Sequence, residues 1–197
     1  IQRFATDHSV IFAYADDSTI RAVIDYHGAA KEGSDGPPRF ASHTCTLKLE
    51  RSTEWNAWKG QADKPIEQHA FADFVEERSP DFVDPDAATM LEIATNFQVN
   101  RKMQFTSAVR LESGDVQFQY TTDTASKSLE IPNSFKIRVP VFKHGDPVEV
   151  SARFRYRISE GDLRLRYKLD RADVVYDNAW LDVVEAIRAR TSLVVFL

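Results

Sequence analysis

The sequence predicts an α+β fold, mainly an antiparallel sheet of hairpins and a meander, with two central helices and one C-terminal helix. Two observations support this class. Apolar and polar residues alternate, with the period of a strand, near the N-terminus and through much of the second half. Helical apolar stripes instead lie in the middle and close to the C-terminus. Strands, helices, a meander and a helix in this order are typical of α+β proteins.

The N-terminal quarter of the chain predicts three strands. Residues 9–15 and 19–26 are rich in Val, Ile, Phe and Tyr and are separated by a short acidic turn. Residues 28–38 hold three Gly and two adjacent Pro, which predicts a loop. The strand at residues 40–50 alternates apolar with polar side chains, so Cys45 is expected to be a small buried apolar residue.

Two helices are predicted in the middle of the chain. Asp63 is expected to cap the first, with Pro65 at its first helical position. The second is expected to begin at residues 84–85, an Asp-Pro pair. Before both, Trp55 and Trp58 are expected to flank a short turn and anchor it to the core, with an exposed stacking role as the alternative.

The rest of the chain predicts a meander, a helix and a final apolar strand. Period-two alternation predicts strands over residues 103–111, 116–120, 134–142, 148–158 and 163–169. The helix is expected over residues 177–188, with four buried side chains: Trp180, Leu181, Val184 and Ile187. The apolar run at 192–197 is expected either to close a sheet or to meet another chain.

The composition indicates a folded domain with its own core. The chain has 197 residues, with 13 Phe, 6 Tyr, 3 Trp and only 7 Gly, which excludes disordered and low-complexity classes. This length suits one compact domain, so a single α+β domain over residues 1–197 is predicted. Because the chain begins with Ile1 rather than Met, the full-length protein is expected to carry a further N-terminal segment.

Cysteine content, hydropathy and charge limit the compartments and the binding partners that suit the protein. A single Cys45 excludes an intramolecular disulfide framework and fits a reducing compartment. No apolar run approaches the roughly 20 residues of a membrane span, so no membrane partner is expected. A net charge of −5 does not suggest a general polyanion binder, but it leaves room for a local basic face.

The most informative stretch is a predicted hairpin over residues 152–169. Its apolar residues share one face only if Ile158 lies opposite Leu163, because a one-residue slip would turn one strand's apolar set outward. That register puts cations opposite cations on the other face. The predicted anion-binding residues are Arg153, Arg155, Arg157, Arg164, Arg166 and Lys168.

Directly opposed like charges destabilise a sheet by a few tenths to about 1 kcal/mol per pair, so something must offset them. Neighbouring carboxylates such as Glu149, or solvent exposure alone, are one explanation. A phosphate-bearing ligand, nucleic acid or an acidic partner is the other, and the arginine fork suits phosphate oxygens well. Tyr156 and Tyr167 are expected on the apolar face, which weakens a role in stacking bases of a single strand.

A second polar cluster is predicted at the mouth of the N-terminal loop. Asp25 and His27 lie on one side of the same predicted strand, and His43 is expected opposite them. Asp25, His27 and His43 would suit acid–base or metal chemistry, although polar residues at a loop mouth are the plainer interpretation. None of the five His residues has metal-ligand spacing, so no metal site, cofactor or catalytic residue is assigned.

Several segments together resemble one protein family. They are Ile-Asp-Tyr-His at 24–27, Phe-Ala-Ser-His at 40–43, Glu-Trp-Asn-Ala-Trp at 54–58, and the longer runs at 68–76 and 152–157. In order and spacing they resemble the YfdQ-like proteins of bacteriophages and prophages, a family of unknown function. The resemblance implies a phage or prophage origin and the cytoplasm of a bacterial host. It supplies no catalytic residues.

Three functional hypotheses follow. The first is a non-enzymatic binding protein that holds nucleic acid, a nucleotide or another phosphate-bearing ligand on the basic hairpin. The second is a self-assembling structural or scaffold protein, a homo-oligomer joined through the apolar C-terminal strand. The third and weakest is a metal-dependent hydrolase centred on Asp25, His27 and His43. The sequence favours the first and argues against an enzyme.

Overall fold

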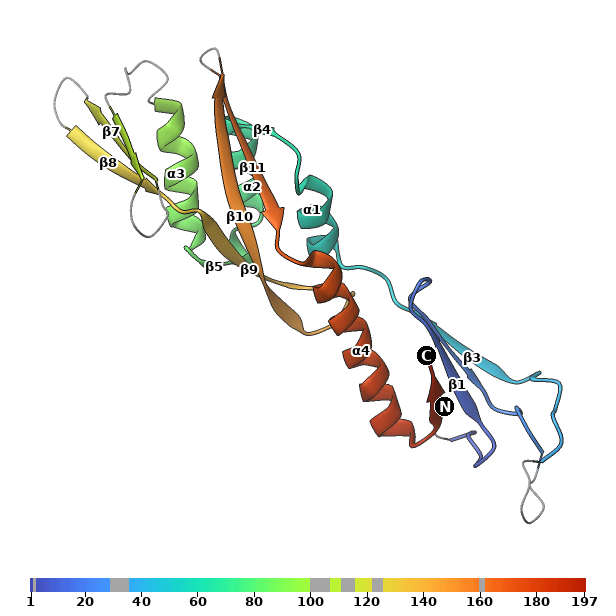
Figure 1. Ribbon diagram of the computed structural model, residues 1–197. Helices are drawn as coiled ribbons and strands as arrows, with labels where there is room; N and C mark the ends of the chain where they lie inside the picture. Colours follow the sequence, from blue (N-terminus) through green and yellow to red (C-terminus); the bar gives the residue numbers. More distant parts are fainter. Residues whose placement is uncertain (2, 29–35, 100–106, 111–115, 122–125, 160–161) are drawn as a thin grey trace. The chain divides into compact units, whose positions relative to one another are not determined.

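The α+β class is confirmed by the fold. The computed structural model describes residues 1, 3–28, 36–99, 107–110, 116–121, 126–159 and 162–197 (Figure 1). The sequence predicted one domain without an internal boundary. The chain forms two compact units, one from residues 1–51 with 173–197 and one from residues 52–172.

The first unit is a four-stranded sheet with the C-terminal helix. Strands β1 (Val10–Tyr14), β2 (Thr19–Val23) and β3 (Thr44–Lys48) form an antiparallel meander. Strand β12 (Val194–Phe196) pairs in parallel with β1, giving the order β12-β1-β2-β3. Helix α4 (Ala172–Thr191) belongs to this unit from Asp173 onward and buries Trp180 and Val184. The main buried side chains of this unit are Ile11, Ala13, Ile20, Ala22, Trp180 and Val184.

Three expectations about this unit can be compared with strand pairing and burial. The apolar C-terminal run joins a sheet, because β12 pairs with β1 of the same chain. Strand β12 is itself an edge strand, and Val194 and Phe196 are exposed, so the alternative of meeting another chain stays open. The expectation of a buried Cys45 is wrong: all five residues of β3 are exposed, since β3 is an edge strand of the sheet. In α4, Trp180 and Val184 are buried as predicted, but Leu181 is 44% exposed and Ile187 is only half-buried.

The second unit holds most of the helices and two sheets. Its helices are α1 (Thr53–Gln61), α2 (Gln68–Glu77), the 3₁₀ turn η1 (Ser79–Asp81) and α3 (Ala87–Val99). Strands β6 (Ser107–Arg110), β7 (Val116–Thr121) and β8 (Ser126–Ile131) form an antiparallel meander. The predicted strand at 103–111 therefore lies partly outside the described residues.

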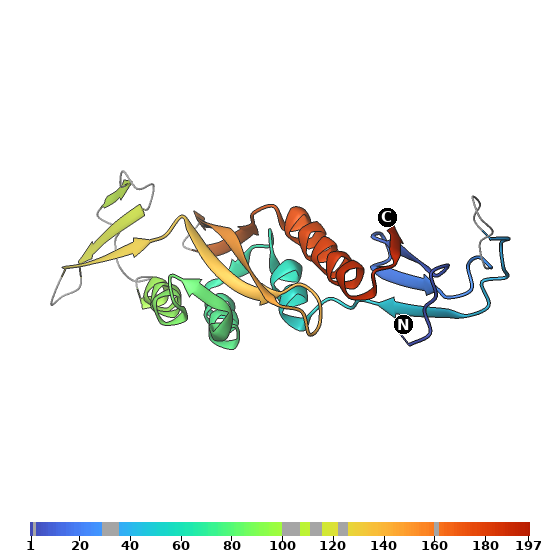
Figure 2. The ribbon, with the colours of Figure 1, turned by 90° about the horizontal axis from the view of Figure 1, so that it is seen from below.

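The larger sheet of this unit has the order β4-β11-β10-β9-β5 and is antiparallel throughout. Its strands are β4 (Ile66–Glu67), β5 (Phe82–Asp84), β9 (Ser134–Pro140), β10 (Pro147–Ser159) and β11 (Asp162–Leu169). Helices α1, α2 and α3 lie on one side of it (Figure 2). The side chains on that face form the core, and those on the opposite face are exposed.

Helix α1 corrects the expectation of a short turn at the tryptophans. The Ser52 hydroxyl accepts a hydrogen bond from the backbone N–H of Trp55 at 2.9 Å and so caps a helix of nine residues. Trp55 and Trp58 both face inward and are 2% and 0% exposed. Burial excludes the alternative of an exposed stacking role for these rings.

Helices α2 and α3 both begin later than predicted. Ile66 and Glu67 pair with β11 as a short strand, so α2 starts at Gln68 rather than next to Pro65. Asp86 Oδ1 accepts the N–H of Thr89 at 2.8 Å, an N-terminal cap for α3 two residues after the predicted start.

Among the described residues, no helix is long and apolar enough to cross a membrane.

An aromatic cluster around Trp58 joins α1, α2 and the sheet. The Trp58 ring lies 4.9 Å from Phe74 and 5.3 Å from Tyr167, measured between ring centroids. Its Nε1 donates to Asp81 Oδ2 at 2.7 Å, and its carbonyl accepts the Tyr167 hydroxyl at 2.8 Å. Burial raises the pKa of Asp81 above its usual value, and the indole N–H opposes that rise. This core fixes the inner face of β9, β10 and β11.

Candidate anion-binding face

The hairpin register predicted from the sequence is confirmed. Strand β10 pairs with β11 so that Arg153 lies opposite Lys168, Arg155 opposite Arg166 and Arg157 opposite Arg164. Phe154 and Tyr167 meet on the inner face, where Phe154 also stacks on Phe71 of α2 with ring centroids 5.4 Å apart. The aromatic core therefore holds the six cations on the outer face, where all are exposed.

The outer face is wider than the hairpin alone. Strand β9 pairs with β10 and adds Lys136 and Arg138, both exposed, on the same side. We call this surface the basic face; its cations are Lys136, Arg138, Arg153, Arg155, Arg157, Arg164, Arg166 and Lys168. Sequence reasoning missed the first two, although the alternation of apolar and basic residues from Phe135 to Val139 carries the signal.

Carboxylates neutralise part of the basic face. Asp170 Oδ1 lies 2.7 Å from Arg153 Nε, and Glu67 Oε1 of β4 lies 2.7 Å from Arg164 Nη1. Glu149, the acidic neighbour expected for Arg153, instead pairs with Lys136 at 2.9 Å and raises the pKa of that lysine. Carboxylates of neighbouring residues therefore neutralise part of the positive charge of the basic face. This is the first of the two explanations that the sequence offered.

The remaining hairpin cations have no such partner in the described part of the chain. Within residues whose side chains are described, no carboxylate lies within 4 Å of the four cations Arg155, Arg157, Arg166 and Lys168. A hollow of about 520 Å³ lies against three of them, Arg155, Arg157 and Arg166, and its other lining residues are Pro65, Tyr156, Arg164 and Leu165. Exposed guanidinium groups around a hollow can hold a group with several anionic oxygens.

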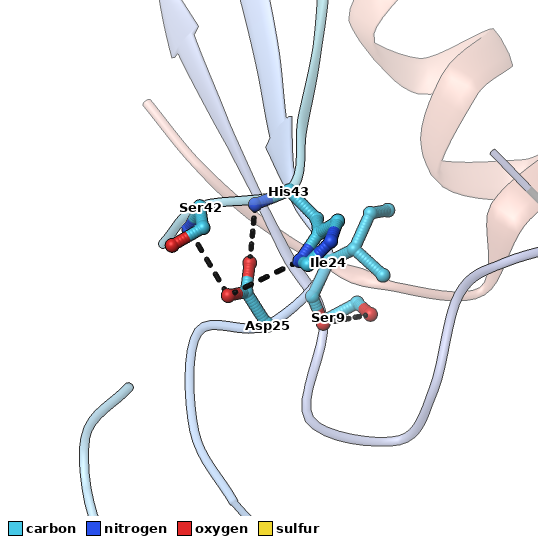
Figure 3. Close-up of polar contacts among 5 residues, drawn as sticks. All are labelled: Ser9, Ile24, Asp25, Ser42 and His43. Carbon is cyan, nitrogen blue, oxygen red and sulfur yellow. Dashed lines mark hydrogen bonds and ion pairs between the residues drawn. The ribbon is translucent and has the colours of Figure 1, made fainter. Parts of the chain in front are cut away.

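The loop-mouth cluster is only partly assembled. Asp25 Oδ1 accepts the backbone N–H of His43 at 2.8 Å, and Oδ2 accepts that of Ser42 at 3.0 Å (Figure 3). His43 Nδ1 lies 3.5 Å from Asp25 Oδ2. The His27 ring instead stacks on Tyr26, with centroids 4.8 Å apart. Among the described side chains, no hydrogen bond or ion pair joins His27 to the other two.

These contacts make Asp25 a clamp between two backbone segments. Ile24 N–H donates to the His43 carbonyl at 2.9 Å, and the Ser9 hydroxyl donates to the Ile24 carbonyl at 2.8 Å (Figure 3). The backbone amide of His43 is the main cause that holds the pKa of Asp25 below its usual value; desolvation opposes it, and the Ser42 amide adds to it. Both carboxylate oxygens are thus used to join the two ends of the loop.

Asp25→Asn is expected to speed hydrogen exchange at the Ser42 and His43 amides by about tenfold, because the carboxylate acceptor is lost. The effect should depend on pH. A carboxylate with a lowered folded pKa stabilises the fold above its unfolded value of 3.8 and loses that contribution as pH falls through the folded pKa. Exchange measured near neutral pH, with the exposed-turn variant Asp16→Asn as control, tests this. Unchanged exchange at both amides would contradict the clamp.

Comparison with known proteins assigns the chain to one protein family. The class that the structure defines is an α+β protein with one exposed basic sheet face. The chain belongs to the family described as "Uncharacterized conserved protein (DUF2303)", whose model matches residues 1–197. No curated protein matches the chain, and no solved structure matches it.

Proposed function

We propose that the protein is a non-enzymatic binding protein that holds a phosphate-bearing polyanion on the basic face. The observation that carries the proposal is the set of directly opposed cations on β10 and β11, four of them without a carboxylate within 4 Å among the described side chains. Such pairs cost free energy in the free protein. A ligand that supplies negative charge between them would repay that cost on binding.

The sequence resemblance to YfdQ-like phage and prophage proteins supports a setting for this function. Under it, the protein is phage- or prophage-encoded and acts in the host cytoplasm, where nucleic acids are the most abundant polyanions. The family itself is uncharacterised, so it assigns neither a phage origin nor a binding function. The basic face is therefore the part of the protein that experiments should address first.

Binding to a labelled DNA of about 20 nucleotides should weaken steeply with salt. If four phosphates are neutralised, log K against log[salt] should have a slope of about −3 to −4, so affinity falls about 100-fold between about 50 and 200 mM salt. Fluorescence anisotropy on the single-stranded and duplex forms measures both quantities. The double variant Arg155→Gln with Arg166→Gln should reduce the slope by about 2.

The matched control removes two lysines that lie off the basic face. Lys48→Gln with Lys59→Gln changes the net charge by the same amount, and both residues are exposed. This control should keep the wild-type slope. If neither DNA form binds, or if both double variants weaken binding equally, the proposal for the basic face is wrong.

Self-assembly is the second candidate, and one observation favours it. The predicted assembly strand β12 and strand β3 are the two edge strands of their sheet in the described structure. Val194 and Phe196 of β12 and Leu47 of β3 are exposed. Exposed edge strands can pair with another chain, here a second copy. Light scattering during size-exclusion chromatography separates the candidates, since a large assembly without bound nucleic acid supports this one.

A further inference from the structure

The hollow on the basic face is lined by two pairs of opposed arginines. Arg155 lies opposite Arg166, and Arg157 lies opposite Arg164, across β10 and β11. Opposed residues have Cα atoms about 4.5–5.5 Å apart, and successive residues on one face are about 6.6–6.8 Å apart along a strand. Long, exposed side chains at these four positions can therefore reach one small group in the hollow. The other four cations of the basic face are not among its described lining residues.

The positive charge of the basic face is least neutralised at the hollow. Away from the hollow, carboxylates pair with two of the other four cations, at 2.9 and 2.7 Å. At the hollow, Glu67 pairs with Arg164. Among the described side chains, no carboxylate lies within 4 Å of the other three arginines, and the rest of the described lining contributes none. The hollow therefore concentrates an excess of positive charge on a small area.

Glu67 reduces that excess in the protein without ligand. It lies opposite Arg164 on β4, an edge strand, and its Oε1 is 2.7 Å from Arg164 Nη1. Its Oε2 lies 3.8 Å from His69 Nδ1. The side chains of Glu67 and Arg164 are both about half exposed, and ion pairs at such positions contribute little to stability. A carboxylate here also repels an incoming anion, so the hollow favours a group that carries more than one negative charge.

A phosphate monoester meets these conditions better than an internal phosphodiester does. Each internal phosphate of a nucleic acid carries one negative charge. A phosphate monoester carries about −1.5 to −2 at pH 7 and has three strong acceptor oxygens. Guanidinium groups match such oxygens in geometry as well as in charge. Three arginines without a described carboxylate partner therefore suit the group that ends a nucleic-acid strand.

We propose that the hollow binds the terminal phosphate of a nucleic-acid strand, while the rest of the basic face holds the phosphodiesters next to it. This inference rests on the proposed function and specifies which part of the ligand the hollow recognises. Arg155, Arg157 and Arg166 donate to the terminal oxygens. Glu67 lowers the affinity of the hollow for singly charged phosphates. A free nucleotide such as AMP carries the same monoester, so the test includes it.

The test compares three single-stranded DNAs of one sequence, about 20 nucleotides long and labelled on an internal base. One carries a 5′-phosphate, one a 3′-phosphate, and one a hydroxyl at both ends. Anisotropy at fixed salt and neutral pH should show at least one phosphorylated strand binding about tenfold more tightly than the hydroxyl strand. The three strands share their internal phosphates, so this affinity ratio isolates the terminal group. AMP should compete only at far higher concentration, because it lacks the neighbouring phosphodiesters.

Two matched pairs of variants locate the recognition. Arg166→Gln should lower the affinity ratio to below about threefold, because the terminal phosphate loses a charge-assisted contact. Lys168→Gln removes the same charge two residues along the same face, outside the described lining, and should leave the ratio unchanged. Glu67→Gln should raise the affinity for the phosphorylated strand by about three- to tenfold. Glu149→Gln, which releases Lys136 away from the hollow, should not change the ratio.

The outcomes separate recognition of the strand end from the basic face as a whole. If both phosphorylated strands bind no more tightly than the hydroxyl strand, the inference is wrong and the proposed function stands. An affinity ratio that falls equally in Lys168→Gln and Arg166→Gln also overturns it, since the hollow would not be the site. If AMP binds as tightly as the phosphorylated strand, the ligand is a free nucleotide and not a strand end. If DNA binds in neither single-stranded nor duplex form, the proposed function is wrong as well.

Discussion

Trp58→Ala is expected to lower the free energy of unfolding by about 3–5 kcal/mol, the usual cost of removing a fully buried tryptophan. Trp58 is 0% exposed and its ring contacts Phe74, Phe82, Phe135 and Tyr167. The variant leaves a cavity where helices α1 and α2 meet the sheet. It also removes the indole donor from the buried Asp81, whose pKa should then rise further. Urea unfolding followed by far-ultraviolet circular dichroism measures the loss.

Two comparisons separate packing from the hydrogen bond. Trp58→Phe keeps a six-membered ring but removes the Nε1 donor together with the rest of the five-membered ring. It should cost less than Trp58→Ala, about 1–3 kcal/mol, mainly the penalty for leaving Asp81 without that partner. Val83→Ala, at a 43% exposed position of the same unit, should change stability by no more than about 0.5 kcal/mol. A loss below about 1 kcal/mol for Trp58→Ala would mean that this cluster is not the core of the unit.

The helix that carries Trp58 shows why a sequence can miss an element. Helix α1 is only nine residues long and buries two side chains, three residues apart, with Gly60 in its last turn. Too few apolar positions exist to reveal a period of 3.6. The signal that was present is the cap: Ser52 precedes the helix, and its hydroxyl accepts the Trp55 amide.

The alternation of apolar and polar residues predicted the register of the hairpin correctly, but it did not predict burial correctly in β3. In the hairpin it fixed the pairing of all six cations, because both strands have one buried apolar face and a slip would expose it. In β3 the same alternation led to a wrong burial for Cys45. Alternation says which side chains share a face, but whether that face is covered depends on the strand's place in the sheet, and β3 is at the edge.

The composition of the basic face could be predicted only in part. Sequence reasoning placed six cations from one continuous segment, because a hairpin brings its own two strands together. Lys136 and Arg138 join them through β9, and Glu67 and Asp170 neutralise two of them from β4 and the end of β11. Contacts between separate strands follow from sheet order, which the alternation of a single segment does not specify.

Arg166→Glu should stabilise the protein and weaken DNA binding. Opposite effects on stability and affinity are expected where charged residues are kept for binding a ligand. The substitution replaces the Arg155–Arg166 opposition with an attractive pair, which should raise the free energy of unfolding by about 0.5–1 kcal/mol at this exposed position. Affinity for duplex DNA should fall by about 100-fold or more, because a phosphate contact becomes a repulsion. Urea unfolding and anisotropy on one preparation give both values.

The same substitution on the opposite strand, alone and combined with Arg166→Glu, supplies the control. Arg155→Glu alone should behave like Arg166→Glu, whereas the double variant again opposes two like charges, so its stability should return to near the wild-type value while binding falls further. Stability and affinity would then vary independently, as expected where charge is kept for a ligand. If Arg166→Glu instead destabilises the fold, carboxylates of the chain itself stabilise these arginines. The facing arginines would then have a structural role and not a binding role.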